Sequence, residues 1–551
     1  MQQGMLEERA PIAKAQKVAW WRGAVIYEIY VRSFQDSNGD GVGDLPGISN
    51  RLEYIADLGV DAIWLTPFFA SPMSDFGYDV SDYRAVDPQF GTLADFEALA
   101  DKARRFGLRI VVDLVFNHTS NRHPWFRESS SDRENPKKDW YVWAEPKPDG
   151  NPPNNWLSVF GGPAWQWEPR RRQFYLHNFL KEQPDLNLHN PAVQDELLAV
   201  AEFWLDRGVS GLRLDAANFY FHDPELRNNP PWPTGQAYEG GGRADNPYYW
   251  QKHVFDKSRP ENIPFLRRLR GVLDGYPDAF AVAEVADDQL VVRTAEYLQA
   301  GLLHTAYNFS FLGQAITPEQ IVQTLTAFST ASPEGWPSWA FSNHDSRRII
   351  SRWPKEVDQI ALSKMLLTLL LTLRGTLFLY QGEELGLPEA DVPFAKLRDP
   401  YGIAFWPDFK GRDGCRTPHP WTSDPPLAGF STVEPWLPID HTHFERAVSV
   451  EQKYKNSPYS YTHELLAWRK EQLALTQGEL VFEASSDHAL LFFRREANNQ
   501  RIGCVFNFSD RFVSMHSPVL GKLLFSERVV ATNKDAEIGP FGFALIELLP
   551  G

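Results

Sequence analysis

The sequence predicts an α/β protein: a closed (β/α)8 (TIM) barrel of parallel strands, a small subdomain inserted after the third strand, and a C-terminal antiparallel β domain. Short apolar runs alternate with amphipathic runs through most of the chain, which is typical of parallel strands joined by crossover helices. Eight strand-like runs occur, the number that closes such a barrel. After about residue 462, strand-like runs follow one another without helices, which predicts the separate β domain.

The elements follow in chain order. Helices are expected near 49–58, 93–106 and 195–207, and the third should stop at Gly208, because glycine readily takes the left-handed conformation that follows many helices. Barrels of this kind carry their chemistry at the carboxyl ends of the strands. The predicted barrel strands are residues 25–30, 60–65, 108–115, 209–214, 279–284, 304–309, 338–342 and 376–380, and those of the β domain include 489–494, 502–508 and 543–548.

Three long segments interrupt the alternation, and each leaves from the carboxyl end of a predicted strand. The first is rich in Trp, Pro, Asn and Gly and is too long for a crossover. Together the three should cover the strand ends and make a pocket rather than an open groove. The predicted division is a barrel over 1–117 and 186–461, an inserted subdomain at 118–185, long loops at 219–261 and 382–438, and a C-terminal β domain at 462–551.

Composition limits the possible functions. The 55 basic and 71 acidic residues give a formal charge of −16, which argues against non-specific nucleic-acid binding. The two cysteines, Cys415 and Cys504, provide neither a disulfide framework nor a cysteine metal site. Residues 1–17 lack the apolar core of a secretion signal, and the longest apolar run, 365–373, is far shorter than the ~20 residues of a membrane span. We therefore expect a cytoplasmic protein with no membrane partner.

Polar residues gather at the predicted strand ends. Asp215 ends the fourth strand, and Arg213 lies on the same face of it, where a cation keeps a carboxylate ionised. Taken alone, this pair fits a structural ion pair equally well. Three acids at three strand ends, with Glu284 and Asp345 as the others, are hard to explain as packing, because an unpaired buried charge is costly. Further polar residues at such ends are Tyr78, Asp79, Asp113, His118 and His344.

Four motifs then connect these residues to a family. They read Asp113-Leu-Val-Phe-Asn-His118, Gly211-Leu-Arg-Leu-Asp215, Ala281-Val-Ala-Glu284 and Phe341-Ser-Asn-His-Asp345. In this order they resemble glycoside hydrolase family 13, the α-amylase family, in its α-glucosidase and oligosaccharide α-glucosidase branch. The resemblance extends from about residue 20 to about residue 421 and implies the barrel fold.

The resemblance implies a role for each of the three acids. Asp215 would be the nucleophile, Glu284 the general acid/base, and Asp345 a residue that binds substrate hydroxyls and stabilises the transition state. A retaining glycosidase needs an ionised nucleophile about 5–5.5 Å from a protonated acid. Arg213 would keep Asp215 ionised, while the apolar residues before Glu284 would favour retention of its proton.

The resemblance also implies sugar-binding residues. His118 and His344 would bind hydroxyls, since an imidazole donates at one nitrogen and accepts at the other. Asp79 and Arg416 would clamp the non-reducing sugar, with Arg412 as the competing candidate for the arginine. Two aromatic residues, Tyr78 beneath the ring and Phe160 beside it, would wall the pocket. Structural histidines and ordinary core aromatics are the alternatives.

A polar loop, Asp36-Ser-Asn-Gly-Asp-Gly-Val-Gly-Asp44, places oxygen atoms at alternate positions as a calcium-binding loop does. Gly47 stands where the twelfth-position Glu of an EF-hand would be. The branch carries a calcium or magnesium site here, which implies a structural ion remote from the chemistry; a polar turn without metal is the alternative. Its ligands would be Asp36, Asn38, Asp40 and Asp44 with the Val42 carbonyl. No organic cofactor is expected.

Some positions depart from the branch or bear on the linkage. Ala216 is small, where relatives that prefer α-1,6 bonds carry Val, so it favours α-1,4 linkages in short substrates such as maltose, with sucrose possible. Glu28, Val31, Ala283 and His419 stand where Gln, Pro, Gly and Met are usual. Glu28 would add a charge near the pocket, and Ala283 would crowd the acid/base.

The function indicated is that of a retaining, exo-acting α-glucosidase that hydrolyses short α-glucosides and transfers glucose to acceptor alcohols. Oligo-1,6-glucosidase, sucrose isomerase and trehalose synthase are alternatives within the class, although the Arg-Leu-Asp-Arg segment of sucrose isomerases is missing after Phe309. An alternative from another class is a non-catalytic sugar-binding or interaction subunit, which the three acids disfavour. The sequence leaves open whether the protein is a monomer or a homodimer.

Overall fold

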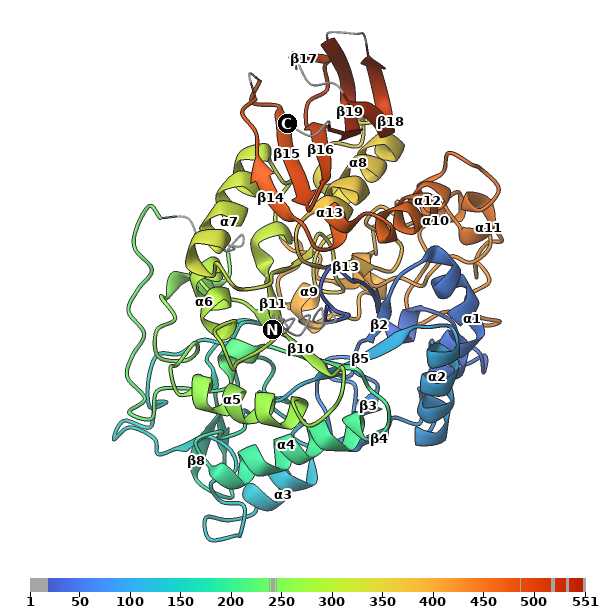
Figure 1. Ribbon diagram of the computed structural model, residues 1–551. Helices are drawn as coiled ribbons and strands as arrows, with labels where there is room; N and C mark the ends of the chain where they lie inside the picture. Colours follow the sequence, from blue (N-terminus) through green and yellow to red (C-terminus); the bar gives the residue numbers. More distant parts are fainter. Residues whose placement is uncertain are drawn as a thin grey trace, which may run out of the picture.

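The computed structural model describes residues 18–548 except 237, 239–242, 244, 486, 517–520 and 532–534. Residues 1–17, in which no secretion signal is expected, lie outside the described residues. At the centre is a parallel sheet with the strand order β11-β10-β9-β5-β2-β1-β13-β12, surrounded by helices (Figure 1). Oγ1 of Thr305 in β11 and Oγ of Ser338 in β12 are 2.5 Å apart, so the two end strands meet and the sheet closes into a barrel.

All eight predicted barrel strands are present, with ends within two residues of the expected ones. Their residues are almost entirely buried because helices cover the outside and side chains fill the inside, as in other parallel sheets. The inner filling includes Ile26, Trp64, Phe280 and Phe378. The strands are β1 (Val25–Ile29), β2 (Ala62–Leu65), β5 (Arg109–Leu114), β9 (Gly211–Leu214), β10 (Phe280–Val285), β11 (Thr305–Asn308), β12 (Ser338–Ala340) and β13 (Thr376–Tyr380).

Two of the barrel helices begin four residues earlier than expected. Asp44 caps α1 by accepting the N–H of Gly47, and Asn190 caps α4 by accepting the N–H of Ala192; a proline follows in the first turn of each. Gly208 comes after α4 with a φ of 85°, the left-handed stop that the sequence predicts. The larger barrel helices are α1 (Leu45–Leu58), α2 (Leu93–Arg105), α4 (Pro191–Leu205), α5 (Asn262–Leu273), α6 (Leu290–Tyr297), α7 (Pro318–Ala331) and α8 (Gln359–Thr372).

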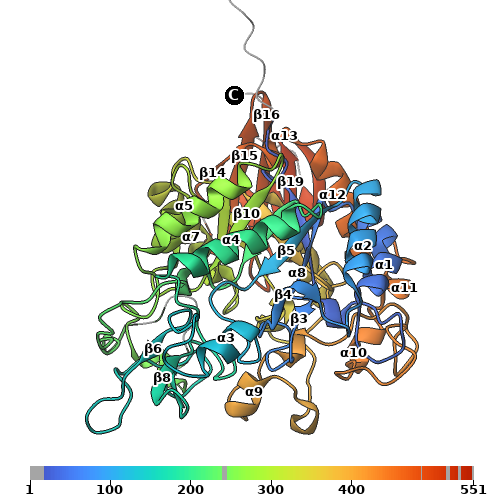
Figure 2. The ribbon, with the colours of Figure 1, turned by 90° about the horizontal axis from the view of Figure 1, so that it is seen from below.

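Inserted segments cover one end of the barrel. After β5 come α3 (Pro124–Ser129) and a small antiparallel sheet of β6 (Trp143–Ala144), β7 (Trp165–Glu168) and β8 (Gln173–Leu176), with the order β6-β8-β7. Figure 2 shows α3, β6, β8 and α9 (Pro400–Ala404) on the side of the molecule away from the C-terminal sheet. A short hairpin of β3 (Phe69–Ala70) and β4 (Asp82–Val86) follows β2.

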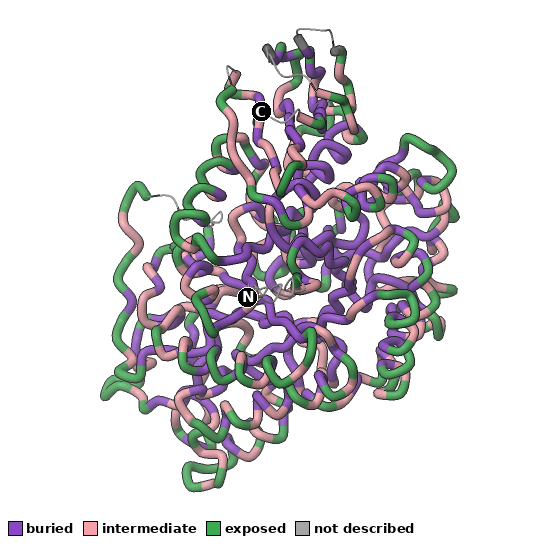
Figure 3. Tube along the Cα trace, viewed as in Figure 1, coloured by how far each residue is buried: buried purple, intermediate pink, exposed green. Residues whose placement is uncertain are grey.

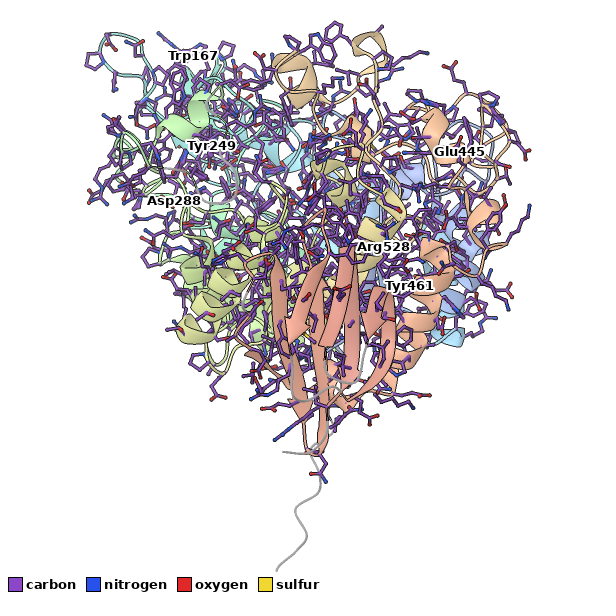
Figure 4. The ribbon with its side chains drawn as sticks, turned by 90° about the horizontal axis from the view of Figure 1, so that it is seen from above. Trp167, Tyr249, Asp288, Glu445, Tyr461 and Arg528 are labelled. Atoms are coloured by element: carbon purple, nitrogen blue, oxygen red, sulfur yellow. The ribbon has the colours of Figure 1, made fainter. Side chains whose placement is uncertain are left out.

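The C-terminal strands form an antiparallel sheet with the order β14-β15-β16-β19-β17, in which β18 also pairs with β19. The ring of Tyr461 packs against Phe525 and Phe543 of this sheet, and Figure 4 shows Tyr461 and Arg528 where the sheet meets the barrel. The elements of this part are α10 (His441–Phe444), α11 (Val448–Glu451), α12 (Pro458–Lys470), α13 (Leu473–Thr476), β14 (Glu479–Phe482), β15 (Leu490–Ala497), β16 (Gln500–Asn507), β17 (Val513–His516), β18 (Lys522–Ala531) and β19 (Asp535–Glu547).

The most apolar segment of the chain became a buried helix. Every residue of α8 except the first two is buried (Figure 3), because the helix contacts α12 and the C-terminal sheet. A helix that is apolar on every side belongs in the core of a large protein. In the described part of the chain, no helix is both long enough and apolar enough to cross a membrane.

Candidate active site

The centre of the site is Arg213, which is fully buried on β9. Its guanidinium donates to Oδ1 of Asp215 at 2.5 Å and to Oδ1 of Asp113 at 2.9 Å. Its other terminal nitrogen lies 2.6 Å from Oε1 of Glu284 and donates to the Tyr307 hydroxyl at 3.0 Å. Since β5, β9 and β10 are neighbouring parallel strands, three carboxyl groups meet at one guanidinium.

The electrostatics of this group combine burial with one shared cation. Burial raises the pKa of Asp215 to about 7 and that of Glu284 to about 7, and Arg213 opposes the shift in both. Burial also raises the pKa of Asp113 to about 6. Arg213 lowers the pKa of Asp215, the direction that the sequence predicts, while burial and the neighbouring Asp113 and Asp345 raise it. The three carboxyl groups therefore retain protons closer to neutral pH than ordinary carboxyl groups do.

The third acid has a different environment. Oδ1 of Asp345 accepts from Arg416 at 2.5 Å and from Arg412 at 3.1 Å, and its Oδ2 lies 3.3 Å from Nε2 of His344. Burial raises the pKa of Asp345, but His344 and the two arginines outweigh it and hold the pKa below its ordinary value. Asp345 is therefore ionised at neutral pH.

Tyr78 and the two predicted histidines lie beside the acids. The Tyr78 ring stacks on His344 with centroids 5.3 Å apart, and its hydroxyl lies 2.6 Å from Nε2 of His344 and donates to Oδ2 of Asp113 at 3.0 Å. Nε2 of His118 lies 3.0 Å from the Tyr78 carbonyl, and its Nδ1 lies 3.1 Å from the amide of Asn117. Burial lowers the pKa of His118 to about 4 and that of His344 to about 3, so both imidazoles are neutral.

The predicted clamp, Asp79 with Arg416, is wrong in its acid. The Asp79 carboxylate is fully buried and accepts from the Ser71 hydroxyl and from the backbone N–H groups of residues 74 and 75. Asp75 faces the cavity instead, and Nη2 of Arg412 lies 2.8 Å from its Oδ1. Phe76 and Gly77, both with positive φ, turn the chain between the two aspartates, and this turn decides which one reaches the cavity.

The arginine of the clamp is also different. Arg416 is almost fully buried, does not line the cavity, and donates from Nε to the His344 carbonyl at 2.7 Å. Arg412, the competing candidate, lines the cavity and bridges Asp75 and Asp345. The motif contains both arginines four residues apart, and only the course of the loop separates their positions.

Gln183 is one of several cavity-lining residues that sequence reasoning missed. The amide nitrogen of Gln183 lies 3.2 Å from Oδ2 of Asp75 and 3.1 Å from Nε2 of His118. Gln183 comes at the end of the inserted segment, just before Pro184 and Asp185, where the chain returns to the barrel. The position of Gln183 next to this return to the barrel is the sequence signal that could have predicted it as a cavity-lining residue.

A cavity of about 370 Å³ lies among these groups, and those that line it are Asp75, Tyr78, His118, Gln183, Asp215, Glu284, Asp345 and Arg412. Phe160, at its wall, stacks on Tyr401 with centroids 5.0 Å apart and carries the Arg412 guanidinium over its ring. Each of the three long segments contributes lining residues, as the sequence predicts. Tyr249 and Asp288 lie on the same side of the barrel as Trp167 of the inserted sheet (Figure 4). The lining from those segments includes Phe160, Phe179 and Gln183; Phe219, Tyr248 and Lys257; and Tyr401, Phe409 and Arg412.

Ala216 follows the first acid directly and also lines the cavity. Its φ of 43° is unusual for a residue other than glycine, and it turns the backbone N–H toward Oε2 of Glu284 at 3.1 Å. The turn therefore connects the carboxyl ends of β9 and β10 through one hydrogen bond.

The comparisons with known proteins agree with this geometry. A family model described as alpha amylase, catalytic domain, matches residues 28–478. The chain belongs to the α-amylase family, glycoside hydrolase family 13. It is 56% identical over 504 residues to the probable alpha-glucosidase of Rhizobium meliloti strain 1021, covering 91% of each chain. It is 36% identical over 540 residues to the oligo-1,6-glucosidase of Heyndrickxia coagulans, covering 91% of this chain and 94% of that one.

A solved structure also supports the assignment to this family. The alpha-glucosyl transfer enzyme XgtA superposes with a TM-score of 0.93 and is 51% identical, covering 97% of this chain and 100% of that one. These relatives confirm the α-glucosidase branch of the α-amylase family, which the four motifs predict, and the barrel with its C-terminal antiparallel domain.

The predicted ion loop of this family member is held by hydrogen bonds. Asp36 accepts the N–H groups of residues 38, 39 and 41, Asp40 accepts that of Val42, and Asp44 accepts those of residues 37 and 47. Over the described residues, no three His, Cys, Asp or Glu side chains converge as a metal site. The ion therefore stays a prediction from the sequence.

The departures from the family pattern have different surroundings. Val31, Ala283 and His419 are buried and do not line the cavity, and both ring nitrogens of His419 are buried without a hydrogen-bond partner. Glu28 is also buried and contacts His344.

Proposed function

We propose that this chain is a retaining, exo-acting α-glucosidase that releases the terminal glucose of short α-glucosides and passes it to water or to an acceptor alcohol. The observation that carries the proposal is the contact of one guanidinium, that of Arg213, with both Asp215 and Glu284 beside a covered cavity. Two carboxyl groups flanking one small pocket, with pKa values raised to about 7, suit a pair that must hold one proton between them.

In the first step, a carboxylate oxygen of Asp215 forms a bond to the anomeric carbon while the bond from that carbon to the glycosidic oxygen breaks. Glu284 gives its proton to the departing oxygen, so the leaving sugar is released as an alcohol. In the second step, Glu284 takes a proton from water or an acceptor hydroxyl, whose oxygen displaces Asp215 and restores the free enzyme. The anomeric configuration is retained because the carbon is attacked twice.

The other residues would position the sugar. Asp345 remains ionised and would stabilise the positive charge that develops on the ring. The ion pair between Asp75 and Arg412 would bind the far hydroxyls and end the pocket, so only a terminal glucose would fit. His118 and Tyr78 would contact the same ring. These roles support exo action on short substrates rather than cleavage within a polymer.

For the linkage we propose α-1,4 bonds as in maltose, with sucrose possible. The support is Ala216, whose methyl group at the cavity wall leaves room for the leaving sugar. Oligo-1,6-glucosidase is the second candidate, since a relative 36% identical over 540 residues carries that name. Initial rates with maltose, isomaltose, sucrose and trehalose distinguish the linkage preferences. The products formed from sucrose distinguish hydrolysis from isomerisation, because an isomerase returns a disaccharide rather than glucose.

The test of the activity itself is cleavage of p-nitrophenyl α-glucoside by the natural protein and by Asp215→Ala. Cleavage by the first and not by the second supports the proposal. No cleavage by either, with sugar binding retained, would instead identify a non-catalytic binding subunit.

We also propose a cytoplasmic location, supported by two free, buried cysteines that need no oxidising compartment. A structural Ca²⁺ or Mg²⁺ in the loop of residues 36–44 is proposed from the family resemblance alone.

A further inference from the structure

A buried acid behind the pocket, Glu28, has no role in the mechanism above. It lies on β1 inside the barrel, fully buried, between Trp64 of β2 and Tyr380 of β13 in the strand register. Its Oε1 is 2.5 Å from Nδ1 of His344 and also accepts the backbone N–H of that residue at 3.3 Å. Glu28 thus contacts the side of the imidazole opposite to the pocket.

A second acid lies at the other nitrogen of the same ring. Oδ2 of Asp345 is 3.3 Å from Nε2 of His344, and Asp345 is ionised because two arginines contact it. A carboxylate this close favours a hydrogen on Nε2 over a lone pair. A neutral imidazole carries one hydrogen, so Nδ1 must then accept a hydrogen bond, and the partner at Nδ1 is Glu28.

The surroundings of Glu28 favour the protonated carboxyl group that such a bond requires. Its Oε2 is buried and has no hydrogen-bond partner, which is costly for an ionised oxygen. Burial raises the pKa of Glu28 well above its ordinary value, with Asp345 and Asp113 adding to the shift and Arg213 and the His344 N–H opposing it. The titratable and charged groups that face Glu28 are Asp113, Arg213, Tyr307, His344, Asp345 and Tyr380.

We propose that Glu28 is a positioning residue: its protonated carboxyl group donates to Nδ1 of His344 and thereby keeps the hydrogen of this imidazole on Nε2, facing Tyr78 and Asp345. The hydrogen bonds on the other side of the ring, beyond Nε2, are consistent with this tautomer. Nε2 donates to the Tyr78 hydroxyl at 2.6 Å or toward Asp345, and the Tyr78 hydroxyl donates to Oδ2 of Asp113 at 3.0 Å. Each hydrogen along this series of hydrogen bonds therefore has an acceptor.

The tautomer has a consequence for the reaction. When Glu28 is neutral, the ionised acid in contact with the imidazole of His344 is Asp345. The hydrogen bond from Glu28 also holds the orientation of the His344 ring, which stacks on Tyr78. The inference about catalysis rests on the proposed function, whereas the protonation of Glu28 does not.

Infrared difference spectroscopy of the natural protein against Glu28→Gln tests the protonation without any substrate. A protonated carboxylic acid has a carbonyl stretch that carboxylates lack, and we expect this band to be lost in Glu28→Gln at pH 7. The exposed Glu479 provides the matched control, since Glu479→Gln removes a carboxylate and should leave the band unchanged. Absence of any lost band in Glu28→Gln would mean that Glu28 is ionised and would overturn the proposal.

Kinetics on maltose test the positioning role. An amide N–H at position 28 donates to Nδ1 as the acid does, so Glu28→Gln should keep kcat/KM within about threefold of the natural protein. Glu28→Leu donates nothing, and its kcat/KM should fall by about tenfold or more, the effect of one unpaired buried polar group. Equal loss in both variants, or no loss in Glu28→Leu, would overturn the role. If no glucoside is cleaved even by the natural protein, the proposed function fails while the infrared result still decides the protonation.

Discussion

Asp215 and Asp345 are the same type of residue, both line one cavity, and their pKa values are shifted in opposite directions. Burial raises both. Around Asp215, however, one guanidinium is divided among three carboxyl groups, whereas two guanidinium groups contact Asp345, although one of them, that of Arg412, also contacts Asp75 and Asp399. Because burial raises both pKa values, the opposite directions follow from the number of guanidinium groups in contact with each carboxylate, one at Asp215 and two at Asp345.

The difference explains a division of labour. Carboxyl groups that share one cation can hold the proton that a general acid needs, and a carboxylate that two cations contact stays charged to face a developing positive charge.

Replacing the acid on the crowded side should be the most damaging change. Asp215→Asn keeps the shape of the side chain but removes the nucleophile, so kcat/KM on maltose should fall by on the order of 10⁴-fold. Steady-state kinetics measure the loss, with circular dichroism as the control for folding. Retention of more than a few per cent of the activity would contradict the assignment.

Glu284→Gln should distinguish the acid role from a general structural role. Maltose cleavage should fall by on the order of 10³-fold, whereas p-nitrophenyl α-glucoside should lose less, because p-nitrophenolate leaves without a proton. The natural enzyme should lose activity as the pH rises through about 7, where Glu284 gives up its proton, and the variant should lack this alkaline limb. Equal losses on both substrates would exclude Glu284 as the acid.

The corrected clamp predicts a contrast between two aspartates four residues apart. Asp75→Asn should raise KM for maltose by about tenfold, since the partner of Arg412 loses its charge while the chemistry remains. Asp79→Asn should leave KM within about twofold, because Asp79 accepts hydrogen bonds from its own loop. A larger effect at Asp79 would restore the original assignment.

At pH 8, replacing the acid on one side of the pocket should raise Tm, and replacing the acid on the other side should lower it. The pKa of Asp215 in the folded protein, about 7, lies above the value near 3.9 of an unfolded Asp, so its ionisation destabilises the fold at pH 8 and Asp215→Asn should raise Tm by roughly 2 °C. The depressed pKa of Asp345 stabilises the fold above the unfolded pKa, and this stabilisation is lost as the pH falls. Asp345→Asn should therefore lower Tm by roughly 2 °C. Shifts of the same sign in both variants would disprove the contrast.

A further prediction concerns the loop of residues 36–44, which contributes no residue to the lining of the cavity. If it holds the predicted ion, a chelator should lower Tm by roughly 1–3 °C, with kcat unchanged at low temperature and recovery on adding Ca²⁺ or Mg²⁺. Asp40→Ala should make Tm insensitive to the chelator. No change in the natural protein would remove the ion from the account.

The sequence alone determined the barrel, its strands and the three acids. Local alternation of apolar and amphipathic runs places strands to within two residues, and residues at strand ends meet because parallel strands share one carboxyl edge. The helix starts at Leu45 and Pro191 were placed four residues late, since capping by Asp44 and Asn190 is a local signal that the apolar pattern does not contain.

Which of two neighbouring polar residues faces the cavity depends on the folded course of the loops. Asp75 rather than Asp79, and Arg412 rather than Arg416, reach it because turns in the loops point one member of each pair inward. The sharing of Arg213 among three acids was likewise beyond the sequence, because Asp113, Asp215 and Glu284 come from separate strands. Charge ratios are properties of the folded arrangement, since they depend on distances between residues that are remote in the chain.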